Sequence, residues 1–325
     1  VAPVSAPQFG ERAELGPDDV CYRHSDRPSL TLCQRCGNTI CPDCQTVSAV
    51  GVLCPDCVRA AQASPGRRAA RSGRATARRL GDPGTPVVTY GIIAVCAVVF
   101  VAQLIGVWFF KDPQTGVDPV TGALWYAPVY SLPDWASALR YSDVVFEPWR
   151  MLTSVFTHST GFLLHILFNM YALWLFGRHL EQVLGRAAFL TLYLFSGLGG
   201  SLGVMLWAYV DPATVGVPTV GASGAIFGVL AATLVAFRAA RVNITSLAVL
   251  VAINFGIGLL PGANISWQAH LGGLLVGAGT MWLLLATRGP RRRNARVFGL
   301  VGVGAALVAL GALYWVVLPP VAWLA

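Results

Sequence analysis

Long apolar runs separated by short polar loops fill the chain from residue 86 onward. A membrane-spanning helix needs about 20 predominantly apolar residues, and seven runs approach or exceed that length. The run at 243–260 is short and contains Asn243 and Asn254, so six spans are the alternative count. The pattern predicts an all-α polytopic membrane protein with spans at 86–110, 162–184, 188–208, 221–240, 243–260, 267–287 and 297–318.

The first 85 residues contain no such run and divide into three parts by composition. Residues 1–20 are rich in Pro, Gly and acidic side chains, which predicts a disordered N-terminus. Residues 21–58 hold seven of the eight cysteines, and residues 59–85 form a basic linker of Ala, Arg, Gly and Ser. We therefore expect a small cysteine-rich module and a flexible linker. A membrane core at 86–287, a basic cytoplasmic loop at 288–296 and a last span follow them.

Charge orients the chain in the bilayer. Charged residues make up 12% of the sequence, about half of what is typical of soluble domains. Arginines gather before residue 86 and at 288–296, whereas the loops at 209–220 and 261–266 contain no Lys or Arg. Because basic loops stay in the cytoplasm, the N-terminus is predicted inside and, with seven spans, the C-terminus outside. The net charge of +8 is thus attributed to topology rather than to nucleic-acid binding. The expected location is a bacterial plasma membrane, with no cleavable signal peptide.

The segment at 111–161 is too long for a simple connection between the first two spans. It is rich in aromatic side chains, which favour the boundary between lipid and water. We expect short helices lying in the outer headgroup region, with these aromatics as anchors: Trp125, Tyr126, Tyr130, Trp135, Tyr141 and Trp149.

Polar residues inside the predicted spans form a candidate catalytic group. Such residues are costly in a membrane and are functional candidates by default. His165 with Asn169, Ser223 and His270 lie on the second, fourth and sixth spans, which all run in the same direction. His165, Ser223 and His270 each fall within about the first turn of their span, so they are expected at similar depth near the outer face.

The residue types then suggest roles. Ser223 is flanked by glycines at the start of a helix, where its hydroxyl is uncrowded and its N–H lies at the positive helix end. His270 is predicted to take the serine proton and return it to the leaving amine. His165 and Asn169 are four residues apart on one helix face and are predicted to donate to the oxyanion, together with the Ser223 N–H.

No carboxylate is predicted to join this pair. Residues 267–287 contain no Asp or Glu. Glu181 lies sixteen residues after His165, about 24 Å along the helix at about 1.5 Å per residue. The site is therefore interpreted as a Ser-His dyad rather than a triad.

These residues resemble the rhomboid family of intramembrane serine proteases over about 150–280. The similarity rests on five motifs in order: Trp149-Arg150, His165-x-x-x-Asn169, Glu181-x-x-x-Gly185, Gly221-Ala222-Ser223-Gly224, and Ala269-His270 with Gly273 and Gly277.

The resemblance implies a six-helix core, followed here by an extra seventh span. It implies an endopeptidase that cleaves within or beside a single transmembrane segment of a membrane-protein substrate, without a catalytic cofactor. Phe227 occupies a position where many members have an aromatic side chain beside the base histidine. His158 is assigned to packing near the site. Structural roles are expected for Trp149, Arg150, Glu181, Gly221, Gly224, Gly273 and Gly277.

The cysteine-rich module predicts two structural zinc ions. Four pairs at two-residue spacing supply eight ligands, enough for two closed tetrahedral sites, and a module this small lacks a sufficient apolar core. Interleaved pairing, as in the B-box and RING modules that it resembles, is plausible, but sequential pairing is also open. The ligands are Cys21, His24, Cys33, Cys36, Cys41, Cys44, Cys54 and Cys57.

The module is further expected to bind a cytoplasmic protein or to regulate the membrane core. Its arginines are balanced by aspartates, so no basic face favours nucleic acid.

Two other function classes compete with the protease. A pseudoprotease that binds membrane proteins would usually lack the serine or the base histidine, and both are present here. A transporter predicts inverted repeats and charged midplane residues, neither of which the sequence contains.

Overall fold

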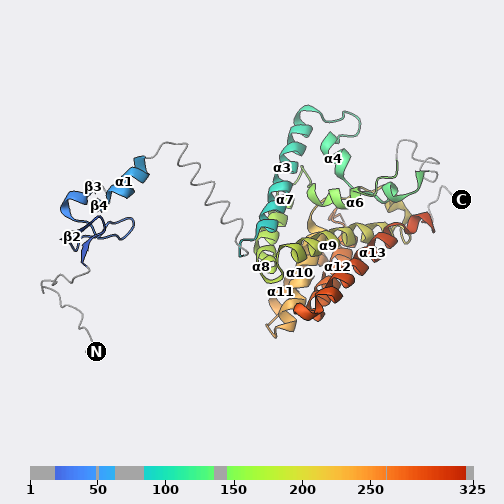
Figure 1. The fold of residues 1–325 in the computed structure, drawn as a ribbon. Helices are drawn as coiled ribbons and strands as arrows, with labels where there is room; N and C mark the ends of the chain where they lie inside the picture. The colour runs from blue at the N-terminus through green and yellow to red at the C-terminus, as the bar shows by residue number, and fades with distance from the viewer. Residues whose placement is uncertain (1–18, 49–50, 63–83, 135–144, 261, 320–325) are drawn as a thin grey trace. The chain divides into compact units, whose positions relative to one another are not determined.

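The computed structural model describes residues 19–48, 51–62, 84–134, 145–260 and 262–319. Contacts divide the chain into two units, Val1–Gly81 and Asp82–Ala325 (Figure 1). Residues 1–18 of the predicted disordered N-terminus, most of the predicted linker, and the predicted interface aromatics Trp135 and Tyr141 lie outside the described residues. The predicted disorder does not extend to residue 20, because Val20 pairs with Pro28 in a hairpin.

The N-terminal unit is built from two short antiparallel hairpins and one helix. Its buried apolar side chains are Ile40 and six cysteines, so its apolar core is almost entirely cysteine. Helix α1 continues past the predicted module boundary at 58. The elements are β1 (Val20–Cys21), β2 (His24–Pro28), η1 (Pro42–Cys44), β3 (Thr46–Ser48), β4 (Gly51–Leu53) and α1 (Pro55–Gln62).

The regular elements described in the second unit are helices, and they follow the apolar pattern of the sequence. Four of its helices are long and apolar enough to cross a membrane: Val87–Phe109, Arg186–Trp207, Trp267–Ala286 and Pro290–Gly311. Two shorter apolar helices, α10 and α11, and a helix interrupted by a π-helical turn occupy the other predicted spans. The number of crossings stays a prediction. The main helices are α3 (Val87–Phe109), α7 (Leu163–Ala172), η4 (Leu173–Gly177), α8 (Arg178–Leu184), α9 (Arg186–Trp207), α10 (Ser223–Ala239), α11 (Thr245–Gly258), α12 (Trp267–Ala286) and α13 (Arg293–Gly311).

The segment between α3 and α7 contains, in its described residues, the short elements that the aromatic pattern predicts, with one difference. Tyr126 was expected at the lipid boundary, but it is fully buried and its hydroxyl lies 2.8 Å from Ser131 Oγ. Its ring belongs to an apolar cluster with Met205 and Tyr314, because the segment folds onto the helices instead of lying apart from them. The elements are α4 (Pro119–Leu124), η2 (Pro128–Ser131), α6 (Arg150–Thr153) and η3 (Ser154–Phe156), and the later short elements are η5 (Pro212–Gly216), η6 (Pro290–Arg292) and η7 (Leu313–Trp315).

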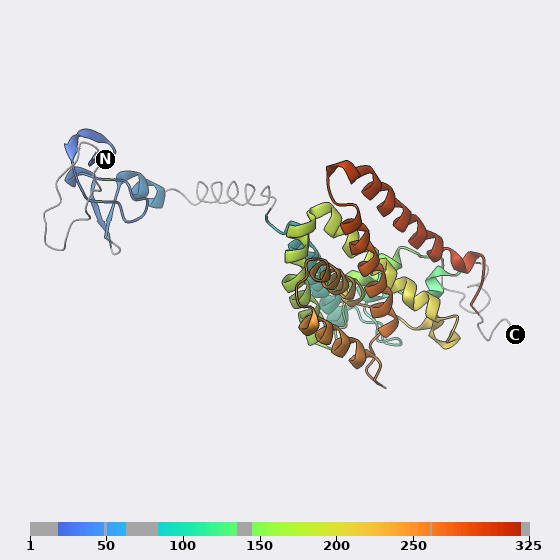
Figure 2. The ribbon, with the colours of Figure 1, turned by 90° about the horizontal axis from the view of Figure 1, so that it is seen from below.

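Glycines bring α12 against α10 and α9. A Cβ on Gly273 would lie 1.9 Å from the carbonyl oxygen of Gly224, and one on Gly272 would lie 2.1 Å from the carbonyl oxygen of Gly199. Backbone therefore touches backbone at both contacts, and no side chain fits between them. Figures 1 and 2 show the resulting arrangement, with α13 lying outside α9 and α12.

The first prediction concerns Gly277→Ala on α12. The added Cβ would lie 2.3 Å from Cα of Gly228, which is backbone and cannot turn aside. We expect about 1–3 kcal/mol of overpacking strain, which outweighs the gain of about 1 kcal/mol in helix propensity. Thermal unfolding in detergent should show a lower midpoint for this variant than for the parent.

Gly279→Ala is the matched control on the same helix. Its Cβ would meet no atom within 4 Å, so the unfolding midpoint should stay level or rise slightly. Equal midpoints for Gly277→Ala and the parent would contradict the close contact.

Candidate functional site

Ser223 and His270 meet across the contact between α10 and α12. The distance between Ser223 Oγ and His270 Nε2 is 3.0 Å, which is a hydrogen bond. Ser223 is the first residue of α10, and His270 lies in the first turn of α12. The glycine contact described above sets the separation of the two helices at this level, and this places the two side chains within reach.

Packing rather than a carboxylate orients His270. The Phe227 ring stacks on the imidazole with 4.1 Å between centroids and 12° between planes. His270 is buried, and among the described residues its Nδ1 has no hydrogen-bond partner. The pair therefore has no third ionisable member in the part of the chain that is described.

The turn before Ser223 requires glycine for two reasons. Gly221 has φ +122°, a conformation that side chains disfavour. A Cβ there would also lie 2.9 Å from His165 Nε2. The Gly221 N–H donates to the Ser154 carbonyl at 3.0 Å, which ties the turn to η3. His165 therefore lies directly against the nucleophile turn.

The hydrogen bonds of His165 determine which ring nitrogen carries the proton. Its Nδ1 accepts from the Ser159 N–H at 3.2 Å, so the neutral imidazole holds its proton on Nε2. This Nε2–H faces the turn at Gly221 and is available as a donor. Asn169 lies one turn further along α7, and its side-chain amide donates to the His165 carbonyl at 2.7 Å.

His158 and Gln103 lie beside this site and are joined by hydrogen bonds. The sequence analysis assigned His158 to packing near the site but did not identify Gln103 as its partner. The His158 ring is 1% exposed, and its centroid lies 5.3 Å from that of His165. Gln103 on α3 holds the His158 backbone from both sides, donating to its carbonyl at 2.9 Å and accepting from its N–H at 3.1 Å. A glutamine inside an otherwise apolar span is the sequence signal that could have pointed to this contact.

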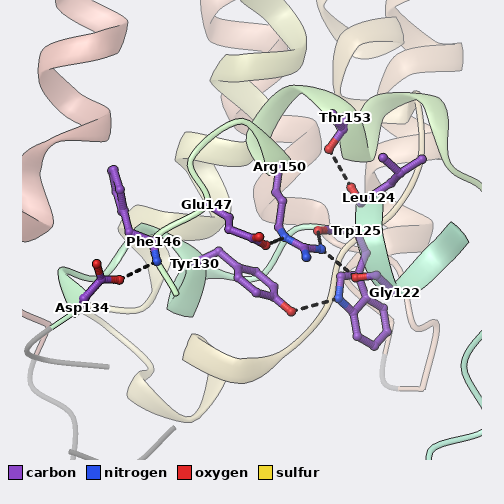
Figure 3. Close-up of polar contacts among 9 residues, drawn as sticks. All are labelled: Gly122, Leu124, Trp125, Tyr130, Asp134, Phe146, Glu147, Arg150 and Thr153. Atoms are coloured by element: carbon purple, nitrogen blue, oxygen red, sulfur yellow. Dashed lines mark hydrogen bonds and ion pairs between the residues drawn. The ribbon is translucent and has the colours of Figure 1, made fainter. Parts of the chain in front are cut away.

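Arg150 is the centre of a network within the segment at 111–161. Figure 3 shows its guanidinium among the Glu147 carboxylate, the Gly122 carbonyl at 2.7 Å and the Trp125 carbonyl at 3.4 Å. The same guanidinium lies 4.1 Å from the ring centroid of Tyr130. Arg150 thus connects four parts of the segment, whereas its neighbour Trp149 is largely exposed.

A backbone pair connects this network to the nucleophile turn. Tyr126 and Thr219 exchange two N–H to carbonyl hydrogen bonds, at 3.1 Å and 2.6 Å. Tyr126 follows the Trp125 carbonyl that Arg150 holds, and Thr219 precedes Gly221 by two residues. The position of the segment is therefore linked to the position of Ser223.

Glu181 lies apart from these residues and caps the N-terminus of α3. Its carboxylate accepts hydrogen bonds from the Val88 N–H at 2.9 Å, the Thr89 N–H at 2.8 Å and the Thr89 hydroxyl at 2.7 Å. These bonds satisfy amides that the first turn of a helix leaves free.

The N-terminal unit holds two clusters of metal-ligand type. In each, the ligand atoms lie within 4.8 Å of one another. The distances from His24 Nδ1 to the sulfurs of Cys21, Cys41 and Cys44 are 3.8, 3.5 and 3.4 Å, and Cys36 Sγ lies 3.7 Å from Cys54 Sγ. A tetrahedral zinc site with bonds of about 2.1 to 2.3 Å requires ligand separations of about 3.5 to 3.8 Å, so both clusters fit the ion. The clusters are Cys21, His24, Cys41 and Cys44, and Cys33, Cys36, Cys54 and Cys57, which is interleaved pairing.

The helical unit is similar in sequence to known proteins. A family profile described as the rhomboid domain matches residues 145–287. The rhomboid protease GluP of Bacillus subtilis is 36% identical over 136 residues, which cover 40% of this chain and 25% of that protein. RHOMBOID-like protein 6, mitochondrial, of Arabidopsis thaliana is 32% identical over 159 residues, 47% of each chain. Rhomboid protein 1, mitochondrial, of Saccharomyces cerevisiae is 28% identical over 199 residues, covering 57% of this chain and 56% of that protein.

The chain thus spans between a quarter and just over half of the length of these relatives. The matched part contains the Ser223–His270 hydrogen bond, and the N-terminal clusters and α13 lie outside the profile. The chain is a multi-pass membrane protein with a rhomboid domain at residues 145–287 and N-terminal Cys/His clusters consistent with a zinc-binding module.

Proposed function

We propose that this protein is an intramembrane serine endopeptidase that cleaves within or beside a transmembrane segment of its substrate. The observation that carries the proposal is the 3.0 Å hydrogen bond between Ser223 Oγ and His270 Nε2. A base within this distance can remove the serine proton as the hydroxyl attacks a carbonyl. The names of two Bacillus subtilis relatives, the rhomboid protease GluP and the putative rhomboid protease YdcA, support the same activity.

In the proposed reaction, Ser223 Oγ attacks the scissile carbonyl while His270 Nε2 takes its proton. The protonated imidazole then donates this proton to the leaving amine, and an acyl-enzyme on Ser223 remains. In the second half, His270 Nε2 takes a proton from water as the water oxygen attacks the acyl carbon. The protonated imidazole then gives this proton to Ser223 Oγ as the ester bond breaks, which releases the acid product and restores the serine hydroxyl. Burial and the Phe227 ring hold the imidazole in place, a task that a carboxylate performs in triads.

The oxyanion is proposed to accept hydrogen bonds from donors beside the turn that precedes Ser223. The Nε2–H of His165 and the backbone N–H of Ser223 are the leading candidates, with the Asn169 amide one turn away. Such donors stabilise negative charge that develops only in the transition state.

The substrate is proposed to be a single-span membrane protein whose helix is unstable near its outer end. Peptide bonds in an intact helix are shielded by their own hydrogen bonds, so the segment must unwind before a carbonyl can reach Ser223. The proposed orientation, with the N-terminus inside, places the site near the outer face.

The two N-terminal clusters are proposed to bind one structural zinc ion each. All four ligands of each cluster come from the protein, so no position is left for catalysis by the metal. Because the unit buries little besides cysteine, metal binding would supply most of its folding free energy.

Substitution of the dyad tests the protease directly. In detergent, the parent should cut a single-span reporter that carries helix-breaking residues at its outer end. Ser223→Ala and His270→Ala should each lower kcat by about 10³-fold or more, because either change removes the activated nucleophile. Fragments are quantified by gel and identified by mass spectrometry. Equal cleavage by parent and Ser223→Ala would refute a serine mechanism.

The oxyanion donors are tested by separating kcat from KM. His165→Ala should lower kcat by about 10²–10³-fold with KM nearly unchanged, because its donor acts in the transition state. Asn169→Ala should lower kcat less, since its amide already bonds the His165 carbonyl. Leu167→Ala, an exposed position on the same helix, is the control and should match the parent. An increase in KM alone for His165→Ala would contradict this role.

Metal content tests the zinc proposal and its pairing. The purified full chain should contain two zinc ions by elemental analysis. The double variant Cys21→Ser/Cys41→Ser should retain one ion, because both residues belong to one cluster. Cys21→Ser/Cys33→Ser should retain none. Cys96→Ser on α3 is the control and should retain two. Loss of both ions from the first variant would indicate sequential pairing.

A further inference from the structure

The helix α13 and the turn η7 that follows it lie outside the rhomboid profile and complete an apolar core with residues inside it. Leu307 and Tyr314 are buried in one cluster with Met151, Leu202 and Met205. Tyr314 is fully buried, although it lies close to the end of the described chain. The end of α13 and η7 therefore pack against the segment at 111–161 beside the C-terminal half of α9.

Two tyrosine hydroxyls lock this end in position. The Tyr314 hydroxyl donates to the Met205 carbonyl near the end of α9, and the Tyr209 hydroxyl donates to the Val317 carbonyl. The two rings meet edge to face, with 5.5 Å between centroids. The position of η7 is thus determined by α9.

Trp315 continues this support to the residues before Arg150. Its ring meets the Phe146 ring edge to face, with 5.1 Å between centroids and 80° between planes. The Phe146 N–H donates to the Asp134 carboxylate at 2.8 Å, and the Glu147 N–H donates to the Tyr130 carbonyl at 2.9 Å (Figure 3). Trp315 therefore packs against Phe146, the residue before Glu147, whose carboxylate accepts a hydrogen bond from Arg150.

From Arg150 the contacts lead to the nucleophile turn. Arg150 holds the Trp125 carbonyl, Tyr126 pairs with Thr219, and the Ser154 carbonyl accepts the Gly221 N–H. Each step is a hydrogen bond or a short stretch of backbone, so a shift at Phe146 has a physical route to Ser223.

We propose that Trp315 is a positioning residue, which braces Phe146 so that the segment at 111–161 holds the Ser223 turn in its reactive geometry. Trp315 itself touches neither Ser223 nor His270 in the described contacts. This inference rests on the proposed protease function for its kinetic consequence. The brace itself is a property of the fold and can be measured separately.

The test compares Trp315→Ala with Phe298→Ala, an exposed aromatic on α13 that serves as the control. Amide hydrogen exchange is measured for residues 124–132 and 145–151 of the full chain in detergent. The rate of Ser223 labelling by a fluorophosphonate and the kcat and KM for the reporter are measured in parallel. For Trp315→Ala we expect faster exchange in both stretches, with labelling and kcat lowered by about tenfold and KM unchanged.

A double-mutant cycle separates positioning from general destabilisation. Phe146→Ala/Trp315→Ala should be no slower than either single variant, because both remove the same contact. The swap Phe146→Trp/Trp315→Phe should restore most of the labelling rate, since it keeps an aromatic pair. Should Trp315→Ala fail to fold, Trp315→Leu supplies the same comparison with the volume largely kept.

Unchanged hydrogen exchange in Trp315→Ala would overturn the brace. Faster exchange with parental labelling and kcat, or additive losses in the double variant, would overturn the positioning role. A parent that is neither labelled nor active, with exchange still faster in Trp315→Ala, would refute the protease while the brace stands.

Discussion

The backbone contact between α10 and α12 is the constraint on which the other features of the site depend. Lipid gives helices no hydrophobic reason to associate, so close van der Waals contact must hold them together. Glycines at 224, 228, 273 and 277 allow this contact, because an added Cβ at Gly273 or Gly277 would overlap the backbone of the facing helix. With the axes this close, a serine at the start of one helix reaches a histidine in the first turn of the other.

Local hydrogen bonds then complete the site that the helix contact brings together. The Ser159 N–H selects the His165 tautomer, and Phe227 holds the His270 ring without a carboxylate. Gln103 fixes the backbone at His158 from a different helix. Gln103, His158 and His270 are buried, and burial makes an unsatisfied polar atom costly.

The segment at 111–161 joins the site to the rest of the helical unit. Arg150 holds two of its carbonyls, while Tyr314 and Trp315 in η7 pack against other residues of it. The N-terminal unit follows a different principle, because its core consists of metal-ligand side chains rather than apolar ones. The chain thus combines a unit stabilised by helix packing with one whose stability is expected to depend on metal.

The sequence alone determined the apolar helices, the eight ligand-type residues and the polar residues near the start of three helices, because periodicity, spacing and burial cost act locally along the chain. It did not determine which cysteine pairs share a cluster, since either pairing satisfies the spacing. It also missed Gln103 and placed Tyr126 at the lipid boundary, although that ring is buried against Met205 and Tyr314. Only the tertiary structure decided these points, and with them the 3.0 Å approach of Ser223 to His270. Each depends on a contact between residues far apart in the chain. A polar residue in an apolar span, such as Gln103, signals that a partner exists, but the local pattern does not identify that partner.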